Sequence, residues 1–293
     1  MAKADYPILL TAHLAERVWG GSYLGDGIGE AWDLSVHESG PCHIVNGPLA
    51  GATLAEVNAD HVDDFGGPIR LLAKRLDAAR DLSVQVHPKL GDPKTEAWIV
   101  LRAQAGAGVY HGFPTAVTRD EIRSAAQDGT LHDLMRFLEV QPGRCVFVPS
   151  GTVHAIGSGL FLFEIQQSSN TTYRLHDWGR GRELHVEPGV PCCDLDGAPA
   201  FPPPRPLPTG ALRLVECEHF HVDRIDTHKP YRIDPAGTWR AFLVVAGYCR
   251  IGAVEATAGA TVMIPNAAGE VLVEPSPACT LLIYGPSTRR RRA

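Results

Sequence analysis

Frequent turn residues constrain this chain more than any other feature of its sequence. Its 293 residues include 30 glycines and 23 prolines, and these residues cut the apolar stretches into short runs. The runs suit β-strands and lie at Val146–Val148, Leu160–Ile165, Ala241–Val245 and Thr261–Ile264. Short strands between frequent turns are typical of antiparallel sandwiches and barrels. We therefore predict a mainly β fold.

Helical patterns are few. Thr118 followed three residues later by Glu121 is a capping-box pattern, and it predicts a helix over Asp120–Gln127. Further short helices are predicted at Ala52–Val57, Pro68–Leu76 and Thr130–Phe137.

The proline-rich segment Pro199–Pro208 predicts a division of the chain. Proline lacks the N–H that a sheet ladder needs, so this segment is expected to be a stiff linker. We predict a large domain over residues 1–198, a linker over 199–208 and a smaller β domain over 209–293. A faint repeat supports this division, because Pro142–Pro149 and Ala258–Pro265 both read as a turn, an alternating strand and a proline. A chance match is the alternative.

Composition excludes several classes of function. The net charge of −6 disfavours nucleic-acid binding. The N-terminal residues are too polar for a secretory signal, and no apolar run is long enough to span a membrane. Seven cysteines without a CxxC pair indicate reduced thiols. A cytoplasmic protein with no obligatory protein partner is expected.

Two short motifs place metal-ligating side chains close together in the sequence. On a strand, Ser83, Gln85 and His87 would share one face, because residues two apart point to the same side. Lys94 and Glu96 would share a face in the same way. A solvated strand face is the alternative interpretation for the first motif.

A third motif contributes a histidine. Gly143, Pro149, Gly151 and His154 follow the spacing of the second metal motif of the cupin superfamily, with Ser158 where that motif ends in Asn. In the second copy of the faint repeat, Glu270 stands at the position of His154. A core histidine is the alternative for His154.

Together Gln85, His87, Glu96 and His154 form a mixed nitrogen and oxygen donor set. Two imidazoles, a carboxylate and an amide oxygen suit zinc with positions left for water or substrate. The same set suits Fe(II), Mn(II) or Co(II). The residues alone therefore predict a metal site without choosing the metal.

The segment Phe163–Trp178 reads FEIQQSSNTTYRLHDW. It resembles the E-x-Q-Q-N-S-D-x-T-Y-R-x-x-D signature of type I phosphomannose isomerases, with Ser168 replacing Asn and Asn170 in the polar run. Further segments resemble the family in order over about the first 190 residues. They are Arg17–Gly21, Ile28–Trp32, Leu72–Lys74, Ser83–Pro88, Lys94–Trp98 and Pro149–Gly157.

The resemblance implies a cupin jelly-roll of two domains, with a metal only in the larger N-terminal one. It implies one Zn²⁺ per chain, bound by His87, Glu96, His154 and Gln85, and a catalytic role for Arg174. Residues that match the family's pocket are Trp19, Glu30, Lys74, Ser83, Lys94 and Glu164. The implied activity is the interconversion of mannose 6-phosphate and fructose 6-phosphate through a cis-enediol.

This chemistry needs a base for a carbon-bound proton. Glu164 lies in a run that reads as a buried strand, where its pKa is expected to be raised. Its alternative role is an ion pair with Arg174. Lys94 is the second candidate, because burial near a metal is expected to lower its pKa. Arg174 suits either the developing oxyanion or the phosphate.

Two other classes of function fit part of the pattern. A Fe(II) dioxygenase uses a similar set of two histidines and a carboxylate, and a sugar-sensing cupin would bind without reacting. The substrate could also be free mannose or another phosphosugar. The basic tail Arg289–Arg292 is expected to be solvated.

Overall fold

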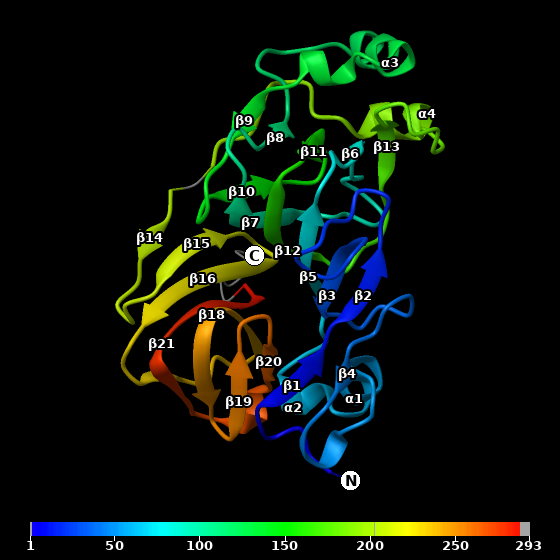
Figure 1. The fold of residues 1–293 in the computed structure, drawn as a ribbon. Helices are drawn as coiled ribbons and strands as arrows, with labels where there is room; N and C mark the ends of the chain where they lie inside the picture. Colours follow the sequence, from blue (N-terminus) through cyan, green and yellow to red (C-terminus); the bar gives the residue numbers. More distant parts are fainter. Residues whose placement is uncertain (1, 202, 288–293) are drawn as a thin grey trace. The chain divides into compact units, whose positions relative to one another are not determined.

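The computed structural model describes residues 2–201 and 203–287. The tail Arg289–Arg292 lies outside the described residues. The fold is mainly β, as predicted, and the chain divides into two units (Figure 1). Unit 1 comprises Met1–His13, Trp32–Ala73 and Pro202–Ala293, and unit 2 comprises Leu14–Ala31 and Lys74–Phe201. None of the helices within the described ranges has the length and apolar character needed to cross a membrane.

Unit 1 is built on a ten-stranded antiparallel sheet. Its strand order is β14-β15-β16-β21-β18-β20-β1-β4, with β17 paired to β21 and β19 paired to β18. The strands are β1 (Ile8–Thr11), β4 (His43–Ile44), β14 (Arg205–Pro206), β15 (Leu212–Glu216), β16 (Phe220–Thr227), β17 (Tyr231–Ile233), β18 (Arg240–Ile251), β19 (Val254–Thr257), β20 (Thr261–Ile264) and β21 (Val271–Pro286).

The core of unit 1 is apolar. Phe242 and Val244 of β18 lie opposite Ile283 and Leu281 of β21, and all four are buried in one cluster. Each side chain of this kind stabilises the fold by roughly 1.5–3 kcal/mol when fully buried.

The N-terminal residues belong to unit 1, which differs from the contiguous division predicted from the sequence. Strand β1 pairs with β20, with Ile8 opposite Met263, and the two are side by side in Figure 1. Pairing over about 250 residues leaves no local signal, so the linker alone could not reveal it. Arg205–Pro206 also pairs with β15 as a short strand at the edge of the sheet, the place where proline is tolerated. The expectation that the whole segment avoids sheet is therefore wrong.

Two short helices cover part of unit 1, namely α1 (Leu54–Asp60) and α2 (Val62–Phe65). Thr53 and Glu56 form a capping box at the start of α1, which confirms a helix near the predicted Ala52–Val57. The helix predicted at Pro68–Leu76 is wrong, because strand β5 (Leu71–Ala78) occupies most of it. A continuous buried run has no period by which helix and strand can be told apart.

Unit 2 holds two further sheets. The boundaries between the units fall within β2, β3 and β5, so each of these strands has residues in both units. The six-stranded sheet has the order β10-β7-β12-β5-β3-β2 and includes β2 (His13–Glu16), β3 (Ile28–Leu34), β7 (Glu96–Ala103), β10 (Cys145–Val148) and β12 (Leu160–Gln167). The five-stranded sheet has the order β13-β6-β11-β8-β9 and comprises β6 (Val84–Val86), β8 (Gly108–His111), β9 (Phe137–Glu139), β11 (His154–Ile156) and β13 (Tyr173–His176).

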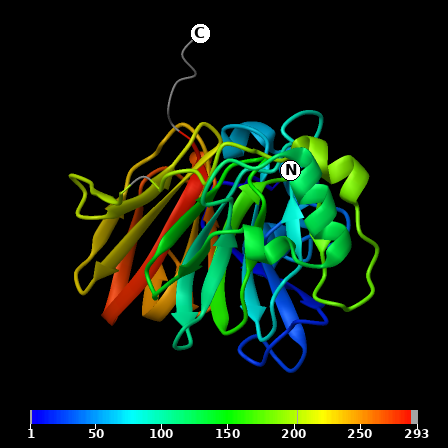
Figure 2. The ribbon, with the colours of Figure 1, turned by 90° about the horizontal axis from the view of Figure 1, so that it is seen from above.

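Helices α3 (Arg119–Asp128) and α4 (Val186–Gly189) pack together beside the five-stranded sheet (Figures 1 and 2). The predicted Thr118–Glu121 capping box is present at the start of α3. The helix predicted at Thr130–Phe137 is only a 3-10 turn over Leu131–Leu134, after which the chain becomes extended. The other 3-10 turns are Gly47–Leu49, Val190–Cys192 and Asn266–Ala268.

Candidate metal centre and active site

Three metal-ligating side chains meet inside unit 2. His87 follows β6, Glu96 begins β7 and His154 begins β11. One donor atom from each residue lies within 4.8 Å of the other two. All three side chains are buried, with relative exposures of 1%, 0% and 1% respectively. Strand alternation positions them, because Val84 and Val86 of β6 point into an apolar cluster on the other side.

Backbone carbonyls orient both histidine rings. His87 Nδ1 donates to Thr171 O at 2.9 Å, and His154 Nδ1 donates to Thr152 O at 2.8 Å. Each Nε2 therefore keeps its lone pair and faces Glu96, at 3.5 Å for His87 and 3.4 Å for His154. Burial lowers the pKa of both rings, to about 3 for His154. Both imidazoles are neutral at physiological pH, as a metal ligand must be.

Glu96 supplies the negative charge of this cluster. Burial alone would raise its pKa, but Lys94 and His87 more than offset this and hold the pKa well below its ordinary value. Lys94 Nζ lies 2.7 Å from Oε2, yet neither buried oxygen accepts a hydrogen bond of normal geometry from the described residues. The ion pair with Lys94 offsets part of the cost of burying this carboxylate, and a cation bound by its oxygens would offset more. One carboxylate and two neutral imidazole nitrogens are also ligands that suit a divalent cation.

Gln85, the predicted fourth ligand, stands beside this cluster. Its amide Nε2 lies 3.2 Å from His154 Nε2. The amide oxygen is the atom that binds metals, so Gln85 would join the ligands by turning its amide over.

Lys94 is buried against the same carboxylate, and its Nζ is also 3.4 Å from His87 Nε2. Burial lowers the pKa of Lys94, but the carboxylates of Glu96 and Glu164 outweigh it and the pKa is raised. This direction applies to the metal-free chain, in which Glu96 keeps its full charge. The expectation that burial near a bound metal lowers the pKa of Lys94 stays a prediction, and Lys94 stays the second candidate for the base.

Glu164 lies on β12 directly opposite Trp98 of β7. Its Oε2 accepts a hydrogen bond from Trp98 Nε1 at 3.0 Å, and its Oε1 lies 3.8 Å from Lys74 Nζ. Burial, followed by the charge of Glu96, raises the pKa of Glu164 as predicted. The alternative role as an ion-pair partner of Arg174 finds no support, since both residues interact elsewhere.

Further charged residues extend from Glu164. Lys74 Nζ lies 3.9 Å from Glu30 Oε2, which accepts a hydrogen bond from Arg17 at 3.0 Å. Ser83 is buried one residue before β6. Trp19 is buried in an apolar cluster with Trp98 and Val148. The structure thus brings Lys74 and Glu30 to Glu164 and places Trp19 in the core, which is the more common position of a lone tryptophan.

Arg174 lies opposite Gln85 in the ladder between β13 and β6, so both side chains leave the same face. Its Nη1 donates to Glu183 O at 2.7 Å. Burial and the neighbouring Arg182 lower its pKa. Asp177 nearby binds both Arg180 and Arg182. Arg174 therefore lies next to Gln85, and its guanidinium bonds to the backbone of Glu183.

Sequence reasoning missed the residues that orient the site. Trp98 holds Glu164, Thr171 holds His87, and Arg17 holds Glu30. Only strand register reveals the first of these contacts, and the second uses a backbone atom that no motif marks. The alternation of polar residues in the sequence predicted neither the Trp98–Glu164 contact nor the Thr171–His87 contact.

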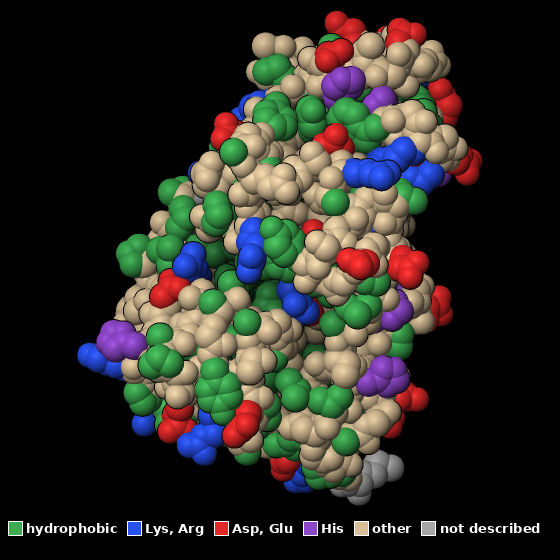
Figure 3. Space-filling model, in the orientation of Figure 1, with side chains coloured by type: hydrophobic (Ala, Val, Ile, Leu, Met, Phe, Trp, Pro, Cys, Tyr) green, Lys and Arg blue, Asp and Glu red, His purple; other side chains and the backbone are tan. Residues whose placement is uncertain are grey.

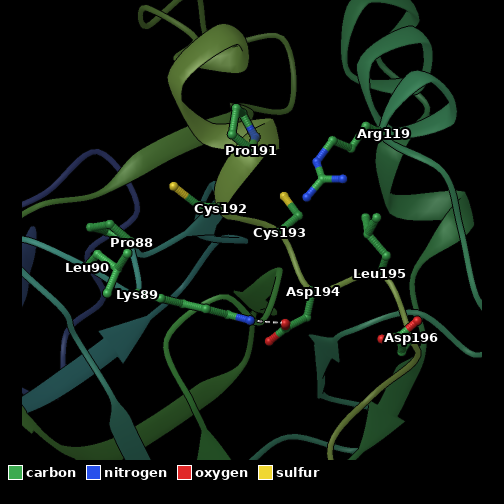
Figure 4. Close-up of a pocket in the computed structure, with 10 residues that line it drawn as sticks. All are labelled: Pro88, Lys89, Leu90, Arg119, Pro191, Cys192, Cys193, Asp194, Leu195 and Asp196. Carbon is green, nitrogen blue, oxygen red and sulfur yellow. Dashed lines mark hydrogen bonds and ion pairs between the residues drawn. The ribbon is translucent and has the colours of Figure 1, made fainter.

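A separate pocket of about 450 Å³ lies in unit 2 (Figure 4). None of the predicted site residues lines it. Its lining includes Lys89, Arg119, Cys192, Cys193 and Asp194, with an ion pair between Lys89 and Asp194. On the face shown in Figure 3, basic and acidic side chains are interspersed.

The strands and the buried His-Glu-His cluster, which could hold a metal ion, are those of a β protein of the cupin type, and comparisons with known proteins agree on the fold. A model of the type I phosphomannose isomerase catalytic domain matches residues 24–106. GmuF of Bacillus subtilis (strain 168), named a probable mannose-6-phosphate isomerase, is 33% identical over 316 residues, covering 96% of this chain and 99% of that protein. The chain belongs to the type I phosphomannose isomerase family.

Solved structures show the same fold. The mannose 6-phosphate isomerase crystal structure from Bacillus subtilis matches with a TM-score of 0.86 and 28% identity, covering 96% of this chain and 99% of the other. A zinc-bound mannose 6-phosphate isomerase structure matches with a TM-score of 0.79 and 12% identity, covering 96% of this chain and 99% of the other. The predicted cupin fold is therefore confirmed.

Proposed function

We propose that this chain is a zinc-dependent mannose-6-phosphate isomerase with one Zn²⁺ per chain. The observation that carries the proposal is the buried cluster of His87, Glu96 and His154 beside a carboxylate of raised pKa, Glu164. The family membership adds the substrate class, a phosphosugar. A cytoplasmic location is part of the proposal and is supported by the odd number of cysteines.

His87, Glu96 and His154 would hold the ion, with Gln85 as a fourth ligand. When bound, the ion supplies Lewis-acid polarisation of the substrate carbonyl. The Glu96 carboxylate would balance one of the two positive charges of the ion, and the neutral imidazoles would add no charge. A protonated Lys94 would donate a hydrogen bond to a substrate oxygen.

Glu164 is proposed as the base. It would remove the proton from C2 of the aldose, giving a cis-enediol once O1 gains a proton, and return the proton to C1 as O2 loses its hydroxyl proton, which gives the ketose. Its raised pKa suits this exchange, because a base works best when its pKa is near the operating pH. Trp98 fixes one carboxylate oxygen and leaves the other facing Lys74.

Arg174 is proposed to bind negative charge, either on the enediol oxygens or on the phosphate. Its planar guanidinium can contact two oxygens at once. Arg174→Lys separates the two roles: a loss in kcat indicates charge stabilisation in the transition state, whereas a raised KM indicates phosphate binding. Lys74 and Ser83 are the further candidates for substrate contacts.

A coupled assay of fructose 6-phosphate formation from mannose 6-phosphate tests the proposal. We expect activity that is lost with chelator and restored by Zn²⁺, together with deuterium entering the sugar from heavy water. Full activity in protein shown by elemental analysis to be metal-free would overturn the zinc assignment. Complete retention of the original hydrogen, even in slow variants, would indicate hydride transfer and leave Glu164 without its role. Oxygen consumption would instead support a Fe(II) dioxygenase.

A further inference from the structure

The two histidines of the metal centre are oriented in different ways. The acceptor for His154 Nδ1 is Thr152 O, two residues earlier in the same turn. The acceptor for His87 Nδ1 is Thr171 O, which is 84 residues away in a loop between β12 and β13. A local turn holds its own carbonyl in place, whereas a distant loop needs ties of its own.

Asp92 provides those ties at the end of the loop that carries Thr171. Thr171 Oγ1 donates to Asp92 Oδ2 at 2.6 Å, a short bond of the charge-assisted kind. Ser169 Oγ donates to the backbone carbonyl of Asp92 at 3.1 Å, and it accepts a bond from Thr171 N at 3.3 Å. Asp92 thus holds the loop on both sides of residue 170.

The start of the same loop is fixed from inside. Gln166 Nε2 donates to the carbonyls of Gln167 and Ser169, at 2.9 and 2.8 Å. Gln167 Oε1 accepts from Thr95 N at 2.9 Å, next to the ligand Glu96. The segment that orients His87 is therefore joined to the strand that carries Glu96, and Asp92 is its outermost attachment.

We propose that Asp92 is a positioning residue for His87, acting through the hydroxyl and then the carbonyl of Thr171. Partners of this kind set the tautomer and direction of a ligating imidazole, and their loss weakens metal binding by roughly 10–100-fold. This inference rests on the proposed function, because Asp92 can affect metal binding only if His87 is a metal ligand.

The chain offers a matched pair of substitutions to test the proposal. Thr171→Val removes the hydroxyl that Asp92 holds and keeps the carbonyl that orients His87. Thr152→Val does the same beside His154, but the Thr152 hydroxyl is buried with no hydrogen-bond partner among the described residues. Thr171→Ser restores a hydroxyl at the first position, and Asp92→Ala removes the acceptor.

Zinc affinity would be measured by competition with a coloured chelator. We expect Thr171→Val and Asp92→Ala to bind zinc at least about tenfold more weakly than the wild type, and Thr171→Ser and Thr152→Val to stay near it. The visible spectrum of the Co²⁺-loaded protein should change in the first two variants only. The urea midpoint of the metal-free protein should be unchanged in Thr171→Val, whereas a general loss of stability would lower that midpoint.

The outcomes separate the two proposals. A wild-type chain that binds no metal overturns the proposed function and this inference with it. Normal wild-type binding together with unchanged affinity and Co²⁺ spectrum in both Thr171→Val and Asp92→Ala overturns only the role of Asp92. A drop in metal-free stability that matches the loss of affinity also overturns it, and Asp92→Ala decides if Thr171→Val fails to fold.

Discussion

Each unit contains the same turn, but among the described residues only the copy in unit 2 leads to a histidine of the His-Glu-His cluster. In unit 2, Gly143 (φ 89°) donates to Val100 O at 2.8 Å, and Val100 N donates to Arg144 O at 2.9 Å. In unit 1, Gly259 (φ 90°) donates to Val244 O at 2.8 Å, and Val244 N donates to Ala260 O at 3.0 Å. The faint sequence repeat thus corresponds to a repeated hydrogen-bond pattern.

Strand register extends the correspondence to the site. Val148 pairs with Glu96 in unit 2, and the matching Ile264 pairs with Arg240 in unit 1. Glu164 lies opposite Trp98, and the matching Ile283 lies opposite Phe242. Unit 1 therefore has a cation and an apolar side chain where unit 2 has its two carboxylates.

The chain also diverges after the shared strand. In unit 2 a turn leads into β11, which starts with His154, whereas in unit 1 a 3-10 turn over Asn266–Ala268 follows β20. The turn and the strand pairing are retained in both units, whereas the side chains at the matched positions differ in charge and polarity. The comparison can be tested by changing matched positions.

The largest effect is expected from His154→Ala. The variant should lose its metal and with it several kcal/mol of transition-state stabilisation, so that turnover falls by at least about 1,000-fold. Elemental analysis and the coupled assay would measure both. Glu270→Ala, at the matching position of unit 1, should keep wild-type metal content and turnover. Stoichiometric zinc in His154→Ala would show that the ligand assignment is wrong.

The next effect is expected from Glu164→Gln, which keeps the shape and removes the proton acceptor. Turnover should fall by at least about 100-fold with zinc still bound. Ile283→Val, at the matching position of unit 1, should leave kcat unchanged. A kcat close to the wild-type value in Glu164→Gln would transfer the role of base to another residue.

A smaller effect is expected from Trp98→Phe, which keeps the ring but removes the N–H that binds Glu164. That bond stabilises the charged carboxylate, so its loss should raise the already raised pKa of Glu164. Activity needs the deprotonated base and is lost as pH falls through this pKa. The acidic limb of kcat/KM should therefore move to higher pH, by about one unit. An unmoved limb would separate Trp98 from the reaction.

The smallest effect is expected where the two units agree. Gly143→Ala and Gly259→Ala each force a side chain into a positive-φ conformation, at a cost of roughly 1–3 kcal/mol. Urea unfolding of the metal-free protein would measure both costs, which should be similar. Clearly unequal costs would indicate that the two turns are not equivalent.

The sequence predicted the chemistry better than the connectivity. Strands at 146–148, 160–165, 241–245 and 261–264 are confirmed within β10, β12, β18 and β20, because turn residues bound them on both sides. His87, Glu96 and His154 meet as predicted, because strand alternation and a turn motif are local properties. Pairing of β1 with β20 is not local, and no pattern near residue 8 could predict it.

The electrostatics could be predicted only in part. A raised pKa for Glu164 followed from its buried strand, but the direction for Lys94 depended on Glu96 and Glu164 together. Likewise, the tie from Asp92 through Thr171 to His87 joins residues about 80 positions apart. Such effects require the fold, since they depend on distances between strands rather than on residue type.

The alternation of side chains along β7 limits how far relatives can differ in the length of this strand. Glu96, Trp98 and Val100 alternate with Ala97 and Ile99, so a ligand, the partner of the proposed base and a core side chain share one face. Inserting or deleting a single residue between Glu96 and Val100 would turn the residues on one side of the change to the opposite face, so that the three side chains could no longer share one face. The loop between His87 and Lys94 carries no such alternation. We therefore expect relatives to differ in length within that loop and to keep the length of β7 fixed.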